Sequence, residues 1–598
     1  MSRLRDGYLW LTVLLSLFAA GPLMQPGYFW GAHDARHQVY FLFEFNRAIQ
    51  DGIWYPRWAP DFTFGYGYPF FNIYGPLAFY VGEFFHLIGF DFVGATKIVF
   101  GLAIVLSGVA MYLFARRLMG PRAALVAGLM YVYVPYHLAD VYVRAALSET
   151  FGLIFLPLAL WGLYETIHAP RLNAVIGTGL AFAAMILSTQ LLTMLAAPLL
   201  AAFVLVLVIA RARDERRIRQ PASLTQELAN LIHIALPPVL GLLLGLGLSA
   251  IFWLPMLAEY KYVRVDQWAG GYYDYREHFI NFFQLFSPQW GFGTSVPGPH
   301  DATPFQLGVV PVCLACMSLY LWRHMSSPTV RRLTVFFLVV ILALIFLMLA
   351  PSIPFWDALN LVRFAQFPWR LLVLAVLALG FLAGTVAATR PATRTRPDLG
   401  LVLLVLLILV GSYPYIRAEI VEPAEGPVGL AGLMRFQQSA GEMTGSTAWV
   451  QEIPKWSAIA DHYIAGKDVG SKIDFTASQE TLDAVPVEVG TFYELVRFKP
   501  FTDPARLVFD IFYYPGWHAY LMQKNDSGYS IRRELKIEPY GKLGKISVQV
   551  TGDRRHVLVR FEDTPVRTAG KILSGLSLAA VALLVIGRAM VRWRYGRR

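Results

Sequence analysis

The chain has 598 residues, of which 56% are hydrophobic and 15% are charged. Soluble domains carry about 25% charged residues, so this composition excludes an ordinary soluble protein. The formal net charge of +11 would suggest a nucleic-acid partner for a soluble chain, but here the arginines cluster in short stretches between apolar runs. Those runs are roughly 17–25 residues long, enough to cross a hydrocarbon core about 30 Å thick. We therefore expect a multi-pass protein of a cell inner (plasma) membrane, surrounded by membrane lipids and binding no nucleic acid.

Basic residues set the expected topology. Ser2-Arg3-Leu4-Arg5 precedes the first apolar run, Tyr8–Met24, so the positive-inside rule places the N-terminus in the cytoplasm and the following loop outside. The next apolar run, Ile73–Phe90, contains Gly75-Pro76 and two ionisable residues. If it crossed the membrane, the cluster Arg116–Arg122 would lie outside. We therefore interpret Ile73–Phe90 as a re-entrant or interfacial segment.

The remaining apolar runs continue this alternation. The run Asn173–Ala210 is about twice the length of one span, so we expect two helices with a break near Ser188-Thr189-Gln190. Taken together, the runs predict an all-α membrane domain over residues 1–412, and with the final helix of the chain they give about 12 transmembrane helices. The strongest basic cluster, Arg211–Arg219, and both termini would then be cytoplasmic.

A change of composition marks a second region after residue 412. Ile546–Val550 and Val557–Phe561 alternate apolar and polar residues with period two, which is typical of strands. Tyr514-Pro515-Gly516-Trp517 predicts a turn between strand-like runs. We expect an extracytoplasmic β-rich domain over residues 413–568, and a final transmembrane helix with a basic cytoplasmic tail over residues 569–598.

Two short outer segments carry the residue types that acid–base chemistry needs. They lie at the outer face on this topology: His33, Asp34 and His37 in the first, and Asp140, Arg144 and Glu149 in the second. A carboxylate there can act as general base towards an acceptor while a phosphate leaves, and we treat Asp34, Asp140 and Glu149 as candidate catalytic residues. The competing interpretation is structural: Asp34 caps a short helix, and Arg144 pairs with Glu149.

Other residues are candidates for binding a metal or a phosphate. His33 and His37 beside a carboxylate suggest a divalent metal, Mg²⁺ or Mn²⁺, although no third fixed ligand is evident and no cofactor is certain. Arginine offers a planar fork that suits phosphate oxygens, and lysine offers a point charge. The candidates for the donor phosphate are Arg370, Arg264, Lys261 and Arg144. Snorkelling of these side chains to lipid headgroups is the alternative.

Several short motifs resemble one superfamily. The early aspartate in a long first outer loop, the second acidic outer segment and the basic turn Ala115–Gly120 resemble the C-type membrane glycosyltransferases. Phe367-Pro368-Trp369-Arg370, Tyr514–Trp517 and Asp563–Arg567 look like a prokaryotic branch labelled as 6-pyruvoyl-tetrahydropterin synthase-related or YfhO-like membrane proteins. No pterin-enzyme zinc motif is present, so the pterin label implies no chemistry.

The resemblance implies an inverting enzyme with a polyprenyl-phosphate sugar donor. The acceptor would be a cell-envelope glycan, lipid or protein, and the catalytic outer loops would be residues 25–94 and 259–304. Asp34 matches the first-loop catalytic acid of the superfamily, and Asp140 or Glu149 matches the second acidic position. The second segment lacks a paired D-x-D, and the tryptophan-rich acceptor motif of oligosaccharyltransferases is missing, which disfavours protein N-glycosylation.

Two other classes of protein compete with this interpretation. A lipid or polysaccharide transporter or flippase would place ionisable or glycine-broken positions near the middle of its spans. Here the ionisable residues collect at the outer ends of spans, which favours an enzyme. A non-catalytic envelope-assembly membrane protein would tolerate replacement of Asp34.

Overall fold

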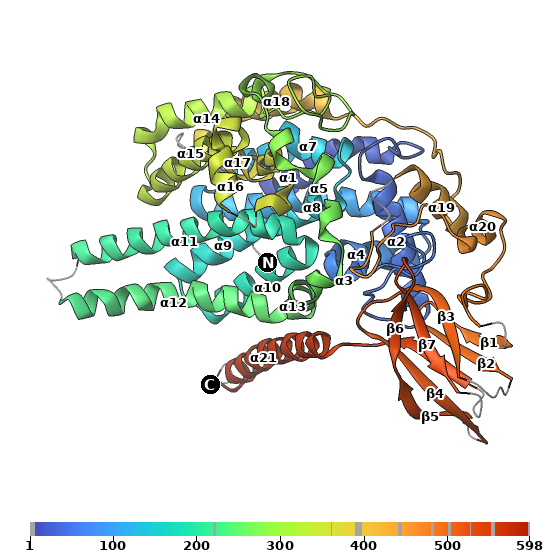
Figure 1. The fold of residues 1–598 in the computed structure, drawn as a ribbon. Coiled ribbons are helices and arrows are strands. Elements are labelled where there is room, and N and C mark those ends of the chain that lie inside the picture. The colour runs from blue at the N-terminus through green and yellow to red at the C-terminus, as the bar shows by residue number, and fades with distance from the viewer. Residues whose placement is uncertain are drawn as a thin grey trace.

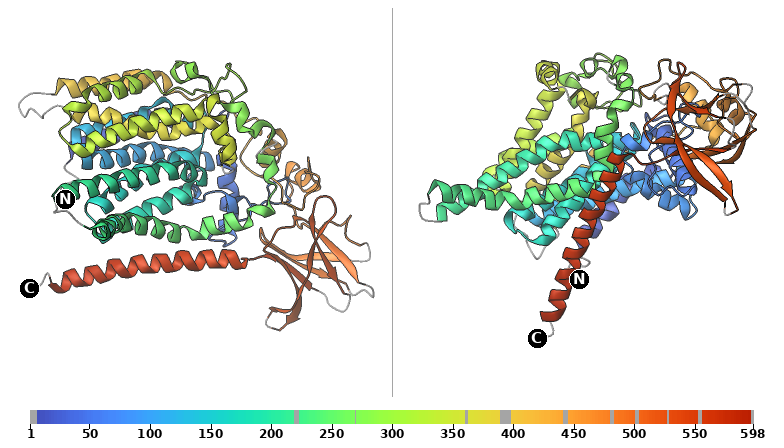
Figure 2. Two further views of the ribbon diagram at one scale, coloured as in Figure 1. Left: turned by 60° about the vertical axis from the view of Figure 1, so that its left-hand side comes forward. Right: turned by 60° about the horizontal axis from the view of Figure 1, so that its bottom comes forward.

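The computed structural model describes ten stretches of the chain: residues 6–218, 223–268, 270–359, 362–388, 398–440, 445–479, 483–499, 504–526, 528–551 and 556–595. A bundle of long helices forms one part, and a β-rich region lies at one end of it (Figures 1 and 2). This is the fold class that the sequence predicts, an all-helical membrane domain with a C-terminal β-rich region.

Long apolar helices make up the membrane part. Within the described residues, seven helical segments are long and apolar enough to cross a membrane, and a bent pair can form an eighth span. The seven are α5 (Phe92–Met119), α8 and α9 (Leu147–Gly152 and Phe155–His168), α11 (Gln190–Ile218), α12 (Leu224–Leu248), α15 (Pro328–Met348), α17 (Leu372–Ala388) with the turn before it, and α21 (Pro565–Tyr595). The bent pair is α6 (Pro121–Tyr133) and α7 (Pro135–Tyr142), which meet at 44°. Pro135 explains the bend, because proline disfavours helical backbone at Val134 before it.

Five shorter apolar helices accompany these spans. They are α1 (Gly7–Ala19), α4 (Leu77–Leu87), α10 (Leu172–Ser188), α14 (Val309–Leu321) and α18 (Leu399–Ser412). At 11 residues, α4 rises only about 17 Å, roughly half of a hydrocarbon core. That is the length of a re-entrant or interfacial segment. If the other four cross, twelve segments span the membrane, as expected from the sequence, but the number stays a prediction.

The long run Asn173–Ala210 forms two helices, and the break between them lies at the predicted position. The helix α10 ends at Ser188 and α11 begins at Gln190, with Thr189 in extended backbone between them. The break lies against the first outer loop, since a Cβ on Gly75 would come within 2.3 Å of Ser188 O. The loop and the break therefore pack backbone to backbone.

The C-terminal region contains eight antiparallel strands within the described residues. One sheet has the order β1-β2-β8-β4-β5 and the other β3-β7-β6. The strands are β1 (Ala484–Val489), β2 (Tyr493–Phe498), β3 (Ala505–Phe512), β4 (Trp517–Asn525), β5 (Gly528–Leu535), β6 (Ile537–Tyr540), β7 (Lys545–Val550) and β8 (His556–Phe561). The two strands predicted from period-two alternation are confirmed as β7 and β8. The predicted turn at Tyr514–Trp517 joins β3 to β4.

In the described part of residues 413–483, β-structure is limited to isolated bridges, and no strand forms. These residues contain two helices, α19 (Leu430–Ser439) and α20 (Ala458–Ile464), which precede the first strand. The helix α19 packs on α2 (Ala35–Gln50) of the first outer loop, where Phe436 stacks on Tyr40 with ring centroids 5.3 Å apart. The C-terminal region therefore covers α2 as well as following the bundle in sequence.

A buried ion pair joins the β-rich region, the first loop and the last helix. Arg567, at the start of α21, is fully buried and donates to Glu259 Oε2 from Nε at 3.0 Å and from Nη2 at 2.9 Å. Glu259 is the last residue of α13 (Ala250–Glu259). It also accepts a hydrogen bond from Asn72 of α3 (Phe70–Ile73). Gly516 has φ +110°, and a Cβ there would come within 2.4 Å of Arg567 Nη1, so the turn needs glycine.

The start of α1 and the end of α21 lie at the end of the bundle opposite the β-rich region (Figure 2). This arrangement agrees with an even number of spans. The assignment of that end to the cytoplasm, and of the β-rich region to the outer side, stays a prediction. Arg3, Arg5, Arg219 and the tail from residue 596, which the topology prediction uses, lie outside the described residues.

Candidate functional site

Backbone hydrogen bonds hold the two acidic outer segments together. His33 N–H donates to Val143 O at 3.0 Å, and Asp34 N–H donates to Arg144 O at 2.8 Å. These four residues are about 110 positions apart in sequence, so the fold and not local structure brings them together. The two segments expected to share a site are therefore in direct contact.

Asp34 stands at the N-cap position of α2, but its side chain does not cap the helix. The carboxylate accepts no cap hydrogen bond, and within the described residues it forms no ion pair. It is half-buried. An anion is stabilised at a helix N-terminus by the positive end of the helix dipole, and Asp34 has this position without spending its oxygens on the backbone. Its carboxylate is available for chemistry.

Arg144 is the centre of the second segment. Its Nη1 donates to Glu149 Oε1 at 2.6 Å and to Tyr136 Oη at 2.9 Å, and it also pairs with Asp140. Thr150 Oγ1 donates to the other oxygen of Asp140 at 3.0 Å. Asp140 is fully buried, and Arg144 and Glu149 are nearly so. Buried charges persist when they are paired and hydrogen-bonded, and this group meets both conditions.

Arg370 supplies a second cation beside this group. It lies in the short turn η10 (Pro368–Leu371), where Nη1 donates to Ala365 O at 3.1 Å and to Gln366 Oε1 at 2.9 Å. Its Nε is buried and has no hydrogen-bond partner among the described residues. Its charge acts on Arg144, Glu149 and Asp34. We call Asp34, Asp140, Arg144, Glu149 and Arg370 the Asp34 cluster.

The second outer loop covers the Asp34 cluster. The Arg144 guanidinium lies over the Trp369 ring, 5.1 Å from its centroid, and Trp369 Nε1 donates to Ser295 Oγ at 3.2 Å. His33 Nε2 lies 2.9 Å from Gly293 O, which ties the first loop to the second. Burial lowers the pKa of His33 below its usual value, so the imidazole is neutral at pH 7 and donates to this carbonyl.

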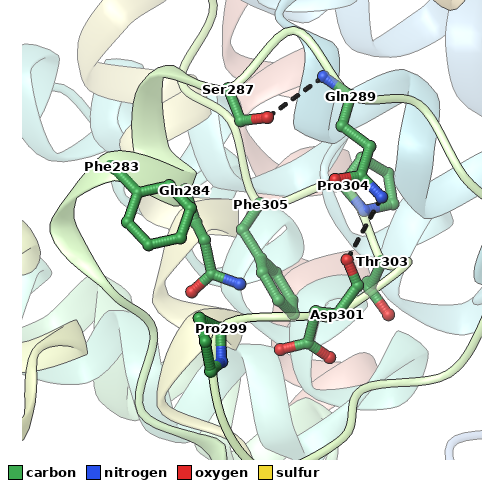
Figure 3. A pocket seen from close by; sticks show the side chains of 9 residues that line it. All are labelled: Phe283, Gln284, Ser287, Gln289, Pro299, Asp301, Thr303, Pro304 and Phe305. Carbon is green, nitrogen blue, oxygen red and sulfur yellow. Dashed lines mark hydrogen bonds between the residues drawn. The ribbon is translucent and has the colours of Figure 1, made fainter.

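A small pocket opens in the second loop next to this contact (Figure 3). Aromatic rings, prolines and polar side chains surround it, with Gln284, Asp301 and Thr303 among the polar ones. Thr303 Oγ1 donates at 2.7 Å to Gly293 O, the carbonyl that His33 contacts. Phe305 lines the pocket and packs on Trp369, with centroids 5.5 Å apart. The pocket is thus one residue layer from the Asp34 cluster.

Two of the predicted phosphate ligands lie elsewhere. Arg264 pairs with Asp266 at 2.6 Å and donates to Val450 O at 3.4 Å, and Lys261 is exposed over the Tyr262 ring. These contacts face the C-terminal region. The structure brings Arg144 and Arg370 to Asp34 but does not bring Lys261 or Arg264 there.

The two histidines do not form a shared metal site. His33 Nε2 must carry a proton to donate to Gly293 O, and His37 is packed edge-on against the Phe436 ring at 4.9 Å. Among the described residues, no group of three His, Cys, Asp or Glu side chains is close enough to hold a metal ion. These side chains therefore do not fit the predicted Mg²⁺ or Mn²⁺ site, and dependence on a metal stays a prediction.

The neutral side chains of the site were not predicted from the sequence. Tyr136 and Thr150 bind the charged group directly, and Trp369 supports Arg144. Tyr136 and Thr150 adjoin His137 and Glu149, so a search for hydrogen-bonding neighbours of the acidic motif would have found them. Trp369 belongs to the motif Phe367–Arg370, in which only Arg370 was predicted to bind the donor.

Part of the chain matches a known protein family, and most of the chain has weak likenesses to several solved structures. Residues 74–240, less than half of the chain, match the family described as dolichyl-phosphate-mannose-protein mannosyltransferase. This segment contains Asp140, Arg144 and Glu149. The match confirms the predicted resemblance to the C-type membrane glycosyltransferases, while the YfhO-like branch stays a prediction.

An uncharacterized protein of Lactococcus lactis subsp. cremoris (strain MG1363) is 21% identical over 256 residues, which cover 42% of this chain and 39% of that protein. The arabinofuranosyltransferase AftD from Mycobacteria has a TM-score of 0.42 and 15% identity, with 78% of this chain and 29% of AftD covered. ArnT from Cupriavidus metallidurans bound to undecaprenyl phosphate has a TM-score of 0.28 and 13% identity, with 73% and 89% covered. The chain spans well under two thirds of the Lactococcus protein and of AftD, and at these TM-scores we infer nothing further from the structures.

Proposed function

We propose that this protein is a membrane glycosyltransferase that moves a sugar from a polyprenyl-phosphate donor to an extracytoplasmic acceptor. The family match over residues 74–240 supports the reaction class. One residue carries the proposal. The Asp34 carboxylate is unpaired, and the Asp34 backbone N–H donates to the carbonyl of Arg144, the centre of a buried charged group. A general base and a phosphate-binding cation are the two groups that such a transfer needs.

The transfer follows a single displacement. Asp34 takes the proton of an acceptor hydroxyl as its oxygen attacks the anomeric carbon of the donor sugar. The new bond forms as the bond between the anomeric carbon and the phosphate oxygen breaks, and polyprenyl phosphate leaves with the electron pair. Attack from the face opposite the phosphate inverts the anomeric configuration.

The two arginines act on the leaving phosphate. Arg370 has an unpaired Nε and is held by carbonyl and amide oxygens, so its guanidinium can donate to a phosphate oxygen without breaking an ion pair. Arg144 is ion-paired to Asp140 and Glu149, which hold its guanidinium in a fixed position beside Arg370. In this proposal Asp140 and Glu149 orient Arg144, and Asp34 acts as the base. Preorganised charge of this kind is usually the largest contribution to catalysis.

The test is a donor panel. Purified protein in lipid nanodiscs is incubated with polyprenyl-phosphate sugars and an extract of envelope glycans, and released polyprenyl phosphate is measured. We expect release with at least one donor from wild-type protein and little from Asp34→Asn. Donor that crosses a liposome membrane unchanged, with no release, would show a transporter and contradict the proposal.

A further inference from the structure

Three polar side chains that the mechanism above does not use lie around Asp34. Gln38 follows Asp34 by one turn of α2, and Gln38 N–H donates to Asp34 O, so the two side chains share a helix face. Ser148 precedes Glu149 in α8, and Tyr74 follows α3 at the end of the first loop. The three come from three separate elements.

Two of these side chains are buried with an unsatisfied atom. Gln38 is 1% exposed and Ser148 is 3% exposed. Gln38 Oε1 and Ser148 Oγ have no hydrogen-bond partner of good geometry among the described residues. Such groups are uncommon because leaving a buried polar atom unpaired costs stability, and each instance calls for an explanation such as a bound molecule.

Tyr74 connects these groups to the charged cluster. Burial, with the nearby negative charge of Asp34, raises the pKa of Tyr74 to about 12, and the polar side chains of Ser148 and Gln38 next to its hydroxyl partly offset that rise. The phenol is therefore neutral and can donate or accept a hydrogen bond. Its ring is fixed by stacking on Phe70, with centroids 4.8 Å apart.

We propose that Gln38, Ser148 and Tyr74 form the subsite for the hydroxyl groups of the transferred sugar. An amide, an alcohol and a phenol without charge match the hydrogen bonds of a sugar ring, whereas the phosphate needs the arginines. Their position beside Asp34 places the ring next to the base. This inference rests on the proposed function, because it assigns the donor sugar of that same reaction.

The alternative is that these groups are internal packing without a ligand. The two interpretations differ in donor use, because a packing role leaves kcat/KM unchanged and a sugar subsite requires it to fall. Removing an unpaired buried hydroxyl with Ser148→Ala relieves a desolvation cost, so the melting temperature of the free protein should stay the same or rise. Ser352→Ala is a matched control, because Ser352 is equally buried but donates to Leu347 O at 3.0 Å and Leu349 O at 2.8 Å. It should lower the melting temperature and leave donor use unchanged.

The decisive experiment crosses protein variants with donor analogues. Wild-type protein first identifies the polyprenyl-phosphate sugar that it transfers, and deoxy versions of that sugar each lack one hydroxyl. Gln38→Met, Ser148→Ala and Tyr74→Phe should each lower kcat/KM for the full donor about 2- to 12-fold, the range for one neutral hydrogen bond. With the deoxy donor that lacks the partner hydroxyl, the variant and the wild type should be equal.

The outcomes separate this inference from the proposed function. No transfer by wild-type protein would defeat the proposed function itself. Transfer by wild-type protein, with variant losses that are the same for every deoxy donor, would overturn the subsite and leave the glycosyltransferase standing. Variants with wild-type kcat/KM and lowered melting temperatures would overturn it as well, because the side chains would then be structural.

Discussion

The substitution Asp34→Asn separates catalysis from structure. The Asp34 carboxylate makes no cap hydrogen bond, and among the described residues it forms no ion pair. Replacing Asp34 therefore does not remove the roughly 0.5–2 kcal/mol that a helix cap usually contributes. Asn or Ala at this position should change the free energy of unfolding by roughly 0.5 kcal/mol or less. Loss of a general base usually lowers the rate by about 10²–10⁴-fold, which is about 3–5 kcal/mol of activation free energy.

The assay is single-turnover release of polyprenyl phosphate with protein in excess over donor, which isolates transfer from product release. Melting is followed on the same samples. Asp91 supplies the matched control, because it caps α5 and its side chain accepts from Gly94 N–H at 2.6 Å. Asp91→Ala should lose about 0.5–2 kcal/mol of stability and keep its transfer rate, the reverse of the Asp34 variants.

Two results would refute this reasoning. One is an Asp34→Asn protein that transfers sugar at the wild-type rate. The other is a loss of activity in Asp34→Ala that tracks a fall in melting temperature like that of Asp91→Ala, since Asp34 would then be structural.

Four further predictions follow from the same contacts. Arg370→Lys should weaken donor use in a folded protein, because lysine lacks the bidentate fork; equal activity of the Lys variant with failure of Ala would show that a point charge suffices. Arg567→Met should lower stability by about 3–5 kcal/mol in chemical denaturation, because it leaves Glu259 buried and unpaired, and adding Glu259→Gln should recover part of this loss. Reporter fusions at Arg217 and Gly528 should give opposite signals, and the same signal at both would end the predicted topology. Transfer should be unaffected by a chelator, since His33 Nε2 is occupied by Gly293 O; inhibition by chelator with rescue by Mg²⁺ or Mn²⁺ would establish the metal.

Local patterns predicted most of the fold. Apolar length located the spans and the break at Thr189, and period two located β7 and β8. These features depend on neighbours in sequence, where burial imposes a regular spacing. The pairing of Glu259 with Arg567 spans 308 positions and has no periodic signal, so composition and spacing could not reveal it.

The candidate site could be predicted only in part, because local patterns reveal single segments and not the contacts between distant ones. Asp34 and the acidic segment from Asp140 to Glu149 stood out because charges are rare near apolar runs. The sequence left open whether Arg144 binds phosphate or pairs with Glu149, and the structure contains that pair. Lys261 and Arg264 looked equivalent to Arg370 by position alone. Only the path of the chain between loops shows that they face the C-terminal region.

A structure of the protein with bound polyprenyl phosphate tests the central claim most directly. We expect the phosphate between Arg144 and Arg370, with Arg370 Nε as a donor and the Asp34 carboxylate beside the sugar position. Phosphate bound at Lys261 and Arg264, or in the pocket of Figure 3, with Asp34 remote from it, would contradict the account.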